Sequence, residues 1–250
     1  MTYNWGKDWD LPTLLKQCEQ AGYAGIELRS THAHKVEPNL TPAERRKVRA
    51  MFADSPVECV GPGTACEYHS SDPAVLKKNI EETKAFIRLC QDIGGTGIKV
   101  RPNGLPKDVP VAKTLEQIGR ALDEVAAFAQ DHGVQIRTEI HGRGTMEIPN
   151  MIQIMRHSVH PNSRLCWNCN RADLDGPGLR ENFLALKDRV STIHIHDLRD
   201  EKGYPWKELF TLLKETGFSG WTLLEEGKVP ADIPAALKEV RKEWEKLTAA

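Results

Sequence analysis

The sequence predicts an α/β protein folded as a single (β/α)8 TIM barrel that spans residues 1–250. Eight short apolar segments alternate with longer segments of helical pattern. From the second apolar segment onward, successive segments start 27 to 40 residues apart, which is the period of a strand followed by a helix. No linker or low-complexity segment interrupts the series, so we expect one domain. A doubly wound open sheet is the alternative, but no glycine-rich fingerprint follows the first strand.

The predicted strands are short apolar runs between turn-forming residues. They cover residues 2–5, 25–29, 57–63, 97–103, 134–142, 163–170, 190–198 and 220–227. The first of them, TYNW, is only four residues long.

The intervening helices begin and end at characteristic residues. Thr41, Pro42 and Glu44 predict a capping box with proline at the first helical position. A long helix is expected over residues 72–94 and another over residues 114–133, and each of these segments ends in glycine. The last helix carries an apolar stripe made of Ile233, Leu237, Val240, Trp244 and Leu247.

Composition narrows the class of protein. The formal net charge is −1, so we expect no strongly basic face and no nucleic-acid partner. No apolar run approaches the roughly 20 residues of a membrane helix, and no signal peptide opens the sequence. Six cysteines in a chain this long do not suggest a disulfide framework, so we expect a cytoplasmic protein. A removed export signal and a homo-oligomer are both left open by the sequence.

Several predicted strands break the continuous apolar pattern of a buried parallel strand, and the polar exceptions recur with a period of two. In residues 134–142, Arg137, Glu139 and His141 share one face of the strand. The same alternation groups Glu27 with Arg29, Lys99 with Arg101 and Asn103, and His194 with His196, and it places Glu225 opposite Leu224. The outer face of a barrel strand packs on helices, so we expect these polar side chains to face the lumen near the carboxyl ends of the strands.

Glu139, His194 and Glu225 are predicted to converge from the fifth, seventh and eighth strands. Two carboxylates and an imidazole suit a divalent cation. The same carboxylates, beside a sugar hydroxyl or carbonyl, could move protons at adjacent carbons. Lys99 and Arg101 are candidates for holding an anionic or hydroxyl-rich end of a substrate. The alternative is a metal-free ion pair of the glutamates with Lys99 or Arg101, with His194 as an ordinary core histidine.

Four motifs, TEIHGRGTM, CWNCN, IHIHDLRD and FSGWTLLEEG, occur in this order at predicted strand ends. Together they resemble the sugar phosphate isomerase/epimerase superfamily, the xylose isomerase-like barrels. The resemblance implies one divalent metal (Mn, Mg, Co or Zn) held by Glu139, Asn168, His194 and Glu225, with the two glutamates as acid and base catalysts. The family usually has aspartate where this chain has Asn168, and a family histidine falls on Asn170. Asn168 offers a carbonyl oxygen without the charge, so we expect weaker metal binding.

The resemblance implies a sugar isomerase or epimerase that transfers a proton through an enediolate. A lyase or hydratase acting on keto-sugars or their glycosides is one alternative, and a carbohydrate-binding protein that lost catalysis with the aspartate is another. A DNA-repair endonuclease is disfavoured, because neither a multi-metal His/Asp set nor a basic surface stands out. The expected partner is a small carbohydrate, and the further candidate contacts for it are His69, His141, Asn170, His196 and Arg199.

Cys166 and Cys169 form a C-x-x-C pair within LCWNCN. On a strand these two side chains point to opposite faces, so we expect neither a redox dithiol nor a zinc knuckle.

Overall fold

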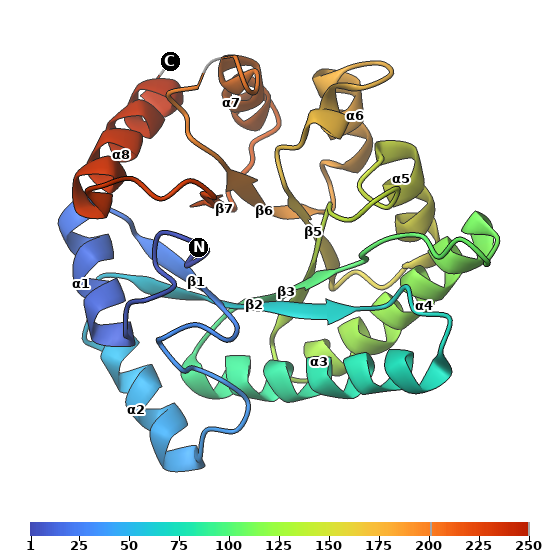
Figure 1. Cartoon of the computed structure of the whole chain (residues 1–250), viewed down its shortest axis with the longest axis horizontal. Helices are drawn as coiled ribbons and strands as arrows, with labels where there is room; N and C mark the ends of the chain where they lie inside the picture. The colour runs from blue at the N-terminus through green and yellow to red at the C-terminus, as the bar shows by residue number, and fades with distance from the viewer. Residues whose placement is uncertain (201, 250) are drawn as a thin grey trace.

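A computed structural model describes residues 1–200 and 202–249. Within these residues, parallel strands form one seven-stranded sheet in the order β1 to β7. The strands are β1 Gly25–Arg29, β2 Glu58–Glu67, β3 Gly97–Arg101, β4 Gln135–Glu139, β5 Ser163–Trp167, β6 Val190–Ile195 and β7 Trp221–Leu224. The helices are α1 Leu11–Ala21, α2 Pro42–Ala53, α3 Pro73–Ile93, α4 Val111–Gln130, α5 Ile148–His157, η1 Arg171–Leu174, α6 Leu179–Leu186, α7 Trp206–Glu215 and α8 Ile233–Ala249. The helices surround the strands, which confirms the predicted TIM barrel (Figure 1).

The prediction of a strand over residues 2–5 is wrong, because this segment lies in bends and turns. It nevertheless lies between the two edges of the sheet. The Met1 amino group donates to a β7 carbonyl at 2.7 Å, and the Thr2 N–H donates to a β1 carbonyl at 3.0 Å. The Trp5 indole then donates to Lys228 in the loop after β7, at 2.7 Å. The segment therefore makes one backbone hydrogen bond to each edge of the sheet and then turns away, so no β-ladder forms.

Most of the strands end earlier than the sequence predicted. β4 ends at Glu139 and β5 ends at Trp167. Positive φ angles follow both strands, 91° at Gly142 and 34° at Cys169, and such backbone cannot continue a β-ladder. Several of the predicted site residues therefore lie just past the strands, in the loops at the carboxyl rim of the barrel.

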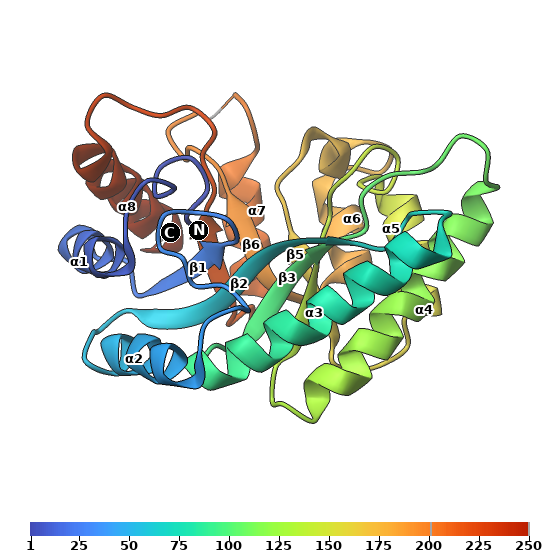
Figure 2. The ribbon, with the colours of Figure 1, turned by 60° about the horizontal axis from the view of Figure 1, so that its bottom comes forward.

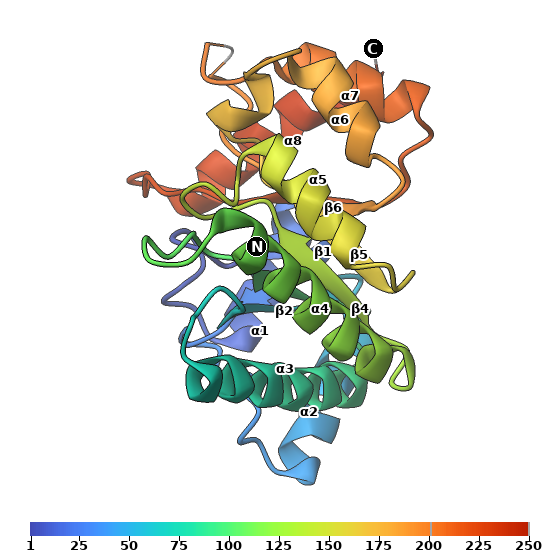
Figure 3. The same ribbon diagram turned by 90° about the vertical axis from the view of Figure 1, so that its right-hand side faces the viewer.

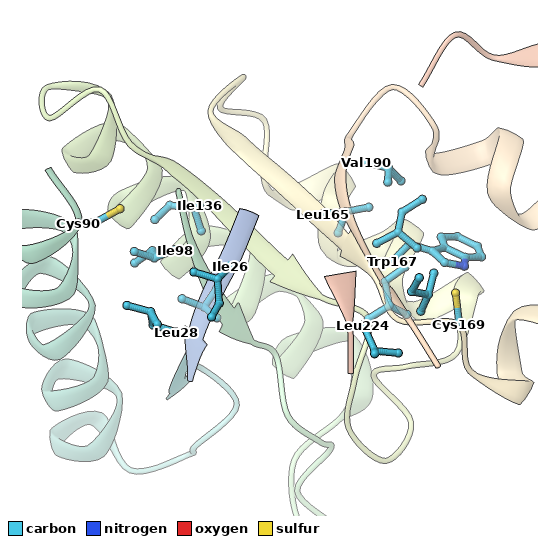
Figure 4. Packing of buried hydrophobic residues seen from close by; sticks show 14 of the residues in the cluster. Ile26, Leu28, Cys90, Ile98, Ile136, Leu165, Trp167, Cys169, Val190 and Leu224 are labelled. Carbon is cyan, nitrogen blue, oxygen red and sulfur yellow. The ribbon is translucent and has the colours of Figure 1, made fainter. Parts of the chain in front are cut away.

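The outward faces of the strands form the main core, as the period-two pattern predicted. Figure 4 shows Ile26 and Leu28 of β1 beside Ile98 of β3, in the layer that also includes Cys90 of α3. α3 packs on β2 and β3, and α4 packs on β4, as the two rotated views show (Figures 2 and 3). Full burial of one such aliphatic side chain contributes about 1.5–3 kcal/mol, so this layer fixes the strands that carry the polar lumen.

The boundaries of α2 and α3 follow the predicted signals, whereas α4 begins and ends three residues earlier than the predicted range 114–133. Thr41 and Glu44 form the expected capping box at the start of α2. α3 ends at Gly94, whose φ of 83° closes the helix with a left-handed residue. Among the described residues, no helix is long and apolar enough to cross a membrane.

Candidate functional site

Three of the predicted ligands converge in the lumen. Glu139 ends β4, His194 lies on β6 and Glu225 directly follows β7. The Nδ1 atom of His194 lies 3.2 Å from Glu139 Oε1 and 3.3 Å from Glu225 Oε2. One potential ligand atom from each of the three residues lies within 4.8 Å of the others. Two carboxylates thus meet at one imidazole nitrogen, and a single proton on that nitrogen cannot bond well to both.

Two further charged residues complete this cluster. Lys99 of β3 donates from Nζ to Glu139 Oε2 at 2.8 Å, and both side chains are almost fully buried. Glu27 of β1 lies with Oε1 3.2 Å from His194 Nε2, on the ring edge opposite Glu225. The sequence pattern placed Glu27 among the lumen-facing polar residues, but the predicted metal and catalytic set did not include it.

The electrostatics of the cluster follow from burial opposed by close charges. Burial by itself favours the neutral carboxyl of Glu139, but the charges of Lys99 and His194 outweigh it and hold its pKa well below the usual range. Burial likewise favours neutral His194, but the Cys166 sulfur and the carboxylates of Glu225 and Glu27 raise the imidazole pKa. Glu139 is therefore ionised and accepts hydrogen bonds. The surrounding carboxylates favour the protonated, positively charged form of His194.

Asn168, one residue past β5, lies against the same carboxylate. Its side-chain N–H donates to Glu139 Oε1 at 3.1 Å. Its Oδ1 atom is buried and has no hydrogen-bond partner in the described part of the chain. An orphaned amide oxygen beside two carboxylates and an imidazole is a donor set that suits a divalent cation. These four residues therefore fit the metal that the sequence resemblance implies. The Lys99 ammonium would compete with that metal for the Glu139 carboxylate.

A second polar group forms the rim beside this cluster. Arg101, a candidate for substrate contact or for an ion pair, pairs with Glu67 of β2, whose Oε1 lies 2.5 Å from the Arg101 Nη2. The same Glu67 oxygen accepts from the Asn103 amide at 2.5 Å, and Asn103 Oδ1 lies 2.8 Å from His141 Nδ1. His69 lies 3.9 Å from the other oxygen of Glu67. The site prediction omitted Glu67, because it lies beyond the expected end of its strand.

The sequence matches the family described as "Xylose isomerase-like TIM barrel" over residues 15–247. The chain belongs to this family. Among solved structures, the IolI protein with a bound zinc atom superposes with a TM-score of 0.80 at 17% identity, covering 97% of this chain and 94% of its own.

Two further members of this group of similar structures are named as sugar epimerases. A D-psicose 3-epimerase solved with D-fructose has a TM-score of 0.83 at 13% identity and covers 100% of this chain and 98% of its own. The 3-keto-D-glucoside 4-epimerase YcjR from E. coli has a TM-score of 0.74 at 12% identity, with coverages of 94% and 93%. At these identities the similarity establishes the xylose isomerase-like fold, and it does not establish the reaction.

Three predicted contact residues of this xylose isomerase-like barrel bind other parts of the chain. His196 Nδ1 bonds to the backbone carbonyl of Glu225 at 2.8 Å. Asn170 donates from Nδ2 to the Ile140 carbonyl at 2.8 Å. Arg199 pairs with Asp197 at 2.7 Å and with Glu239 of α8 at 2.5 Å. These contacts hold rim loops in place, and the sequence pattern alone could not separate that role from substrate contact.

The cysteine pair is arranged as the alternation predicted. Cys166 faces the lumen beside His194, whereas Cys169 lies with Trp167 in the outer core (Figure 4). Both are free thiols, and burial raises the pKa of each.

Asp173, in η1, connects two rim loops next to Asn170. Its Oδ2 accepts from the Asn170 N–H at 2.8 Å and from the Tyr204 hydroxyl at 2.9 Å. Burial raises the pKa of this carboxyl from 3.8 to about 7. The folded chain therefore holds the proton to a higher pH than the unfolded chain does, and this group costs stability as the pH rises from about 4 through 7.

We expect Asp173→Asn to behave like the permanently protonated acid. Its carbonyl oxygen can still accept both hydrogen bonds. The gain in free energy of unfolding over wild type, from urea titrations, should be about 2–3 kcal/mol larger at pH 8 than at pH 5. A difference between the two proteins that does not change with pH would show that Asp173 is ionised throughout.

Proposed function

We propose that this chain is a metal-dependent sugar isomerase or epimerase that transfers a proton next to a carbonyl. The observation that carries the proposal is the convergence of Glu139 and Glu225 on one nitrogen of His194, within 3.3 Å, at the carboxyl rim of a barrel. The epimerase names of two similar structures support the choice of reaction, and the zinc of the IolI protein supports the choice of a metal.

Glu139, Asn168, His194 and Glu225 would hold the ion, with Mn, Mg, Co and Zn as the candidates. When bound, such an ion polarises a carbonyl and stabilises negative charge on the neighbouring oxygen. His194 must release its proton to act as a ligand, and that proton is the positive charge that the carboxylates now stabilise.

Proton transfer itself belongs to the two glutamates. They approach the same point from β4 and from the segment after β7, so one carboxylate can take a proton from a carbon while the other returns one. Glu139 is ionised in the resting protein and therefore ready to act as a base. Lys99 stabilises that ionised form and fixes the orientation of the carboxylate at 2.8 Å.

The test measures turnover and isotope exchange together. Protein loaded with each candidate metal, and protein stripped with EDTA, would be incubated in D2O with D-fructose, D-psicose and a 3-keto-D-glucoside. We expect an isomeric product carrying one solvent deuterium, only with metal present. A product lighter by one water or by the aglycone would indicate the lyase alternative. Full turnover by stripped protein would refute the proposed mechanism.

A carbohydrate-binding protein without catalysis is the second candidate, and Asn168 is the residue that favours it. We expect Asn168→Asp to lower the dissociation constant for Zn²⁺ at least about tenfold, because a carboxylate adds charge beside the ion. In EDTA the same variant should be less stable than wild type, because the new carboxylate faces Glu139 where an amide N–H now donates.

Calorimetric Zn²⁺ titration and urea unfolding measure these two effects. Glu147→Gln, on the loop before α5, changes one formal charge away from the cluster and is the control. Isomerase activity that appears only in Asn168→Asp would identify the natural chain as a binding protein. Unchanged Zn²⁺ affinity would exclude position 168 from the ligand set.

A further inference from the structure

The HGRGT motif locks two rim loops together. The side-chain oxygen of Thr145 donates to the His141 carbonyl at 2.7 Å and accepts from the Gly104 N–H at 3.0 Å. Gly142 has a φ of 91°, and a Cβ on it would lie only 2.7 Å from the Cα of Asn103. Glycine is therefore required at position 142 both by its backbone conformation and by this close approach. The result is that the His141 ring is held beside the Asn103 amide.

The hydrogen bonds in this group determine which way each side chain points. The Glu67 carboxylate, paired with Arg101, can only accept, so the Asn103 atom 2.5 Å from its oxygen is the amide nitrogen. The Asn103 oxygen must then face His141, and the contact of 2.8 Å requires the proton to sit on His141 Nδ1. In the neutral ring, Nε2 consequently carries the lone pair. Within the described residues, Nε2 makes no hydrogen bond.

We propose that Glu67, Asn103 and His141 form a hydroxyl-binding subsite, in which His141 Nε2 accepts a hydrogen bond from a sugar hydroxyl. This inference rests on the proposed sugar function. His141 lies two residues after Glu139, just past the end of β4, so a hydroxyl bound at Nε2 would belong to the same sugar whose reacting carbon lies at Glu139. Arg101 also bonds to Glu67, so the subsite has no net charge and suits an uncharged hydroxyl.

Asn103 and Glu67 act here as positioning residues. Without the Asn103 amide oxygen, no acceptor holds the proton on His141 Nδ1. A His141 ring with its proton on Nε2 would donate to a sugar hydroxyl instead of accepting from it. Asn103→Gly is the sharpest variant, because Asn103 has a φ of 66° and glycine tolerates that conformation. His141→Phe removes the acceptor and keeps a ring of similar size.

The experiment combines imidazole ¹⁵N NMR spectra with D-fructose and D-psicose binding to the Mg²⁺-loaded protein. We expect wild-type His141 to be protonated on Nδ1, and Asn103→Gly to lose this preference. Sugar binding should shift the Nε2 resonance, and the dissociation constant should rise roughly tenfold in His141→Phe. His132→Phe is the matched control, because His132 bonds to Gln91 at the opposite end of the barrel.

The possible outcomes separate failure of the subsite from failure of the proposed isomerase function. A His141 proton on Nε2 in the wild type, or sugar affinity unchanged in His141→Phe, overturns the subsite even if the sugar is turned over. Binding that depends on His141 without turnover supports the subsite and refutes the isomerase. A wild-type protein that binds neither sugar refutes both.

Discussion

Replacing Glu139 with glutamine is expected to lower sugar turnover by about 10²–10⁴-fold, the range for loss of a general acid or base. The amide cannot take a proton from carbon at neutral pH. It also removes the charge that Lys99, Asn168 and His194 all contact. Because the proposed hydroxyl-binding subsite lies elsewhere on the rim, the loss should appear mainly in kcat, with a smaller change in KM.

The measurement is initial rate against sugar concentration at saturating metal. Glu116→Gln is the control, because it makes the same chemical change in a residue that pairs with Arg120 on the outside of α4. Urea unfolding of both variants separates lost chemistry from lost structure. Turnover by Glu139→Gln within a few-fold of wild type would assign the proton transfer to another residue.

Much of the site was predictable because strand periodicity is a strict geometric rule. Once alternating residues face the lumen, Glu139 and His194 must lie inside the barrel, and the short distances between them follow from strand packing. The same rule placed Cys166 and Cys169 on opposite faces. Lys99 was predicted to be either a substrate contact or an ion-pair partner, and its contact with Glu139 shows the ion pair.

The predicted contact residues that bond to other parts of the chain lie where periodicity ends. Asn170, His196 and Arg199 follow their strands, and loop backbone redirects them to carbonyls and surface carboxylates. Glu67 escaped notice because β2 continues four residues past its predicted end. The segment around Thr2 makes single hydrogen bonds to backbone groups at the edges of the sheet, and its sequence looks the same as that of a short strand.

The second large effect is on stability: Lys99→Met is expected to lower the free energy of unfolding by about 3–5 kcal/mol in EDTA. Methionine fills much of the same volume, so packing is largely kept. What changes is electrostatic, because the buried Glu139 carboxylate loses the ammonium at 2.8 Å. Glu27 and Glu225 also contribute to the raised pKa of Lys99, so the variant leaves three carboxylates facing His194 alone.

Urea unfolding with and without Zn²⁺ tests both this loss and the metal site. The control is Lys84→Met, which breaks surface pairs with Glu81 and Glu124 and should cost no more than about 1 kcal/mol. Zn²⁺ should stabilise Lys99→Met more than wild type, because the ammonium no longer competes for Glu139. If the variant is destabilised in EDTA and Zn²⁺ restores nothing, the lumen is a structural ion-pair cluster rather than a metal centre. If EDTA-treated Lys99→Met is as stable as wild type, Glu139 takes up a proton when its partner is lost, and its ionisation depends on Lys99.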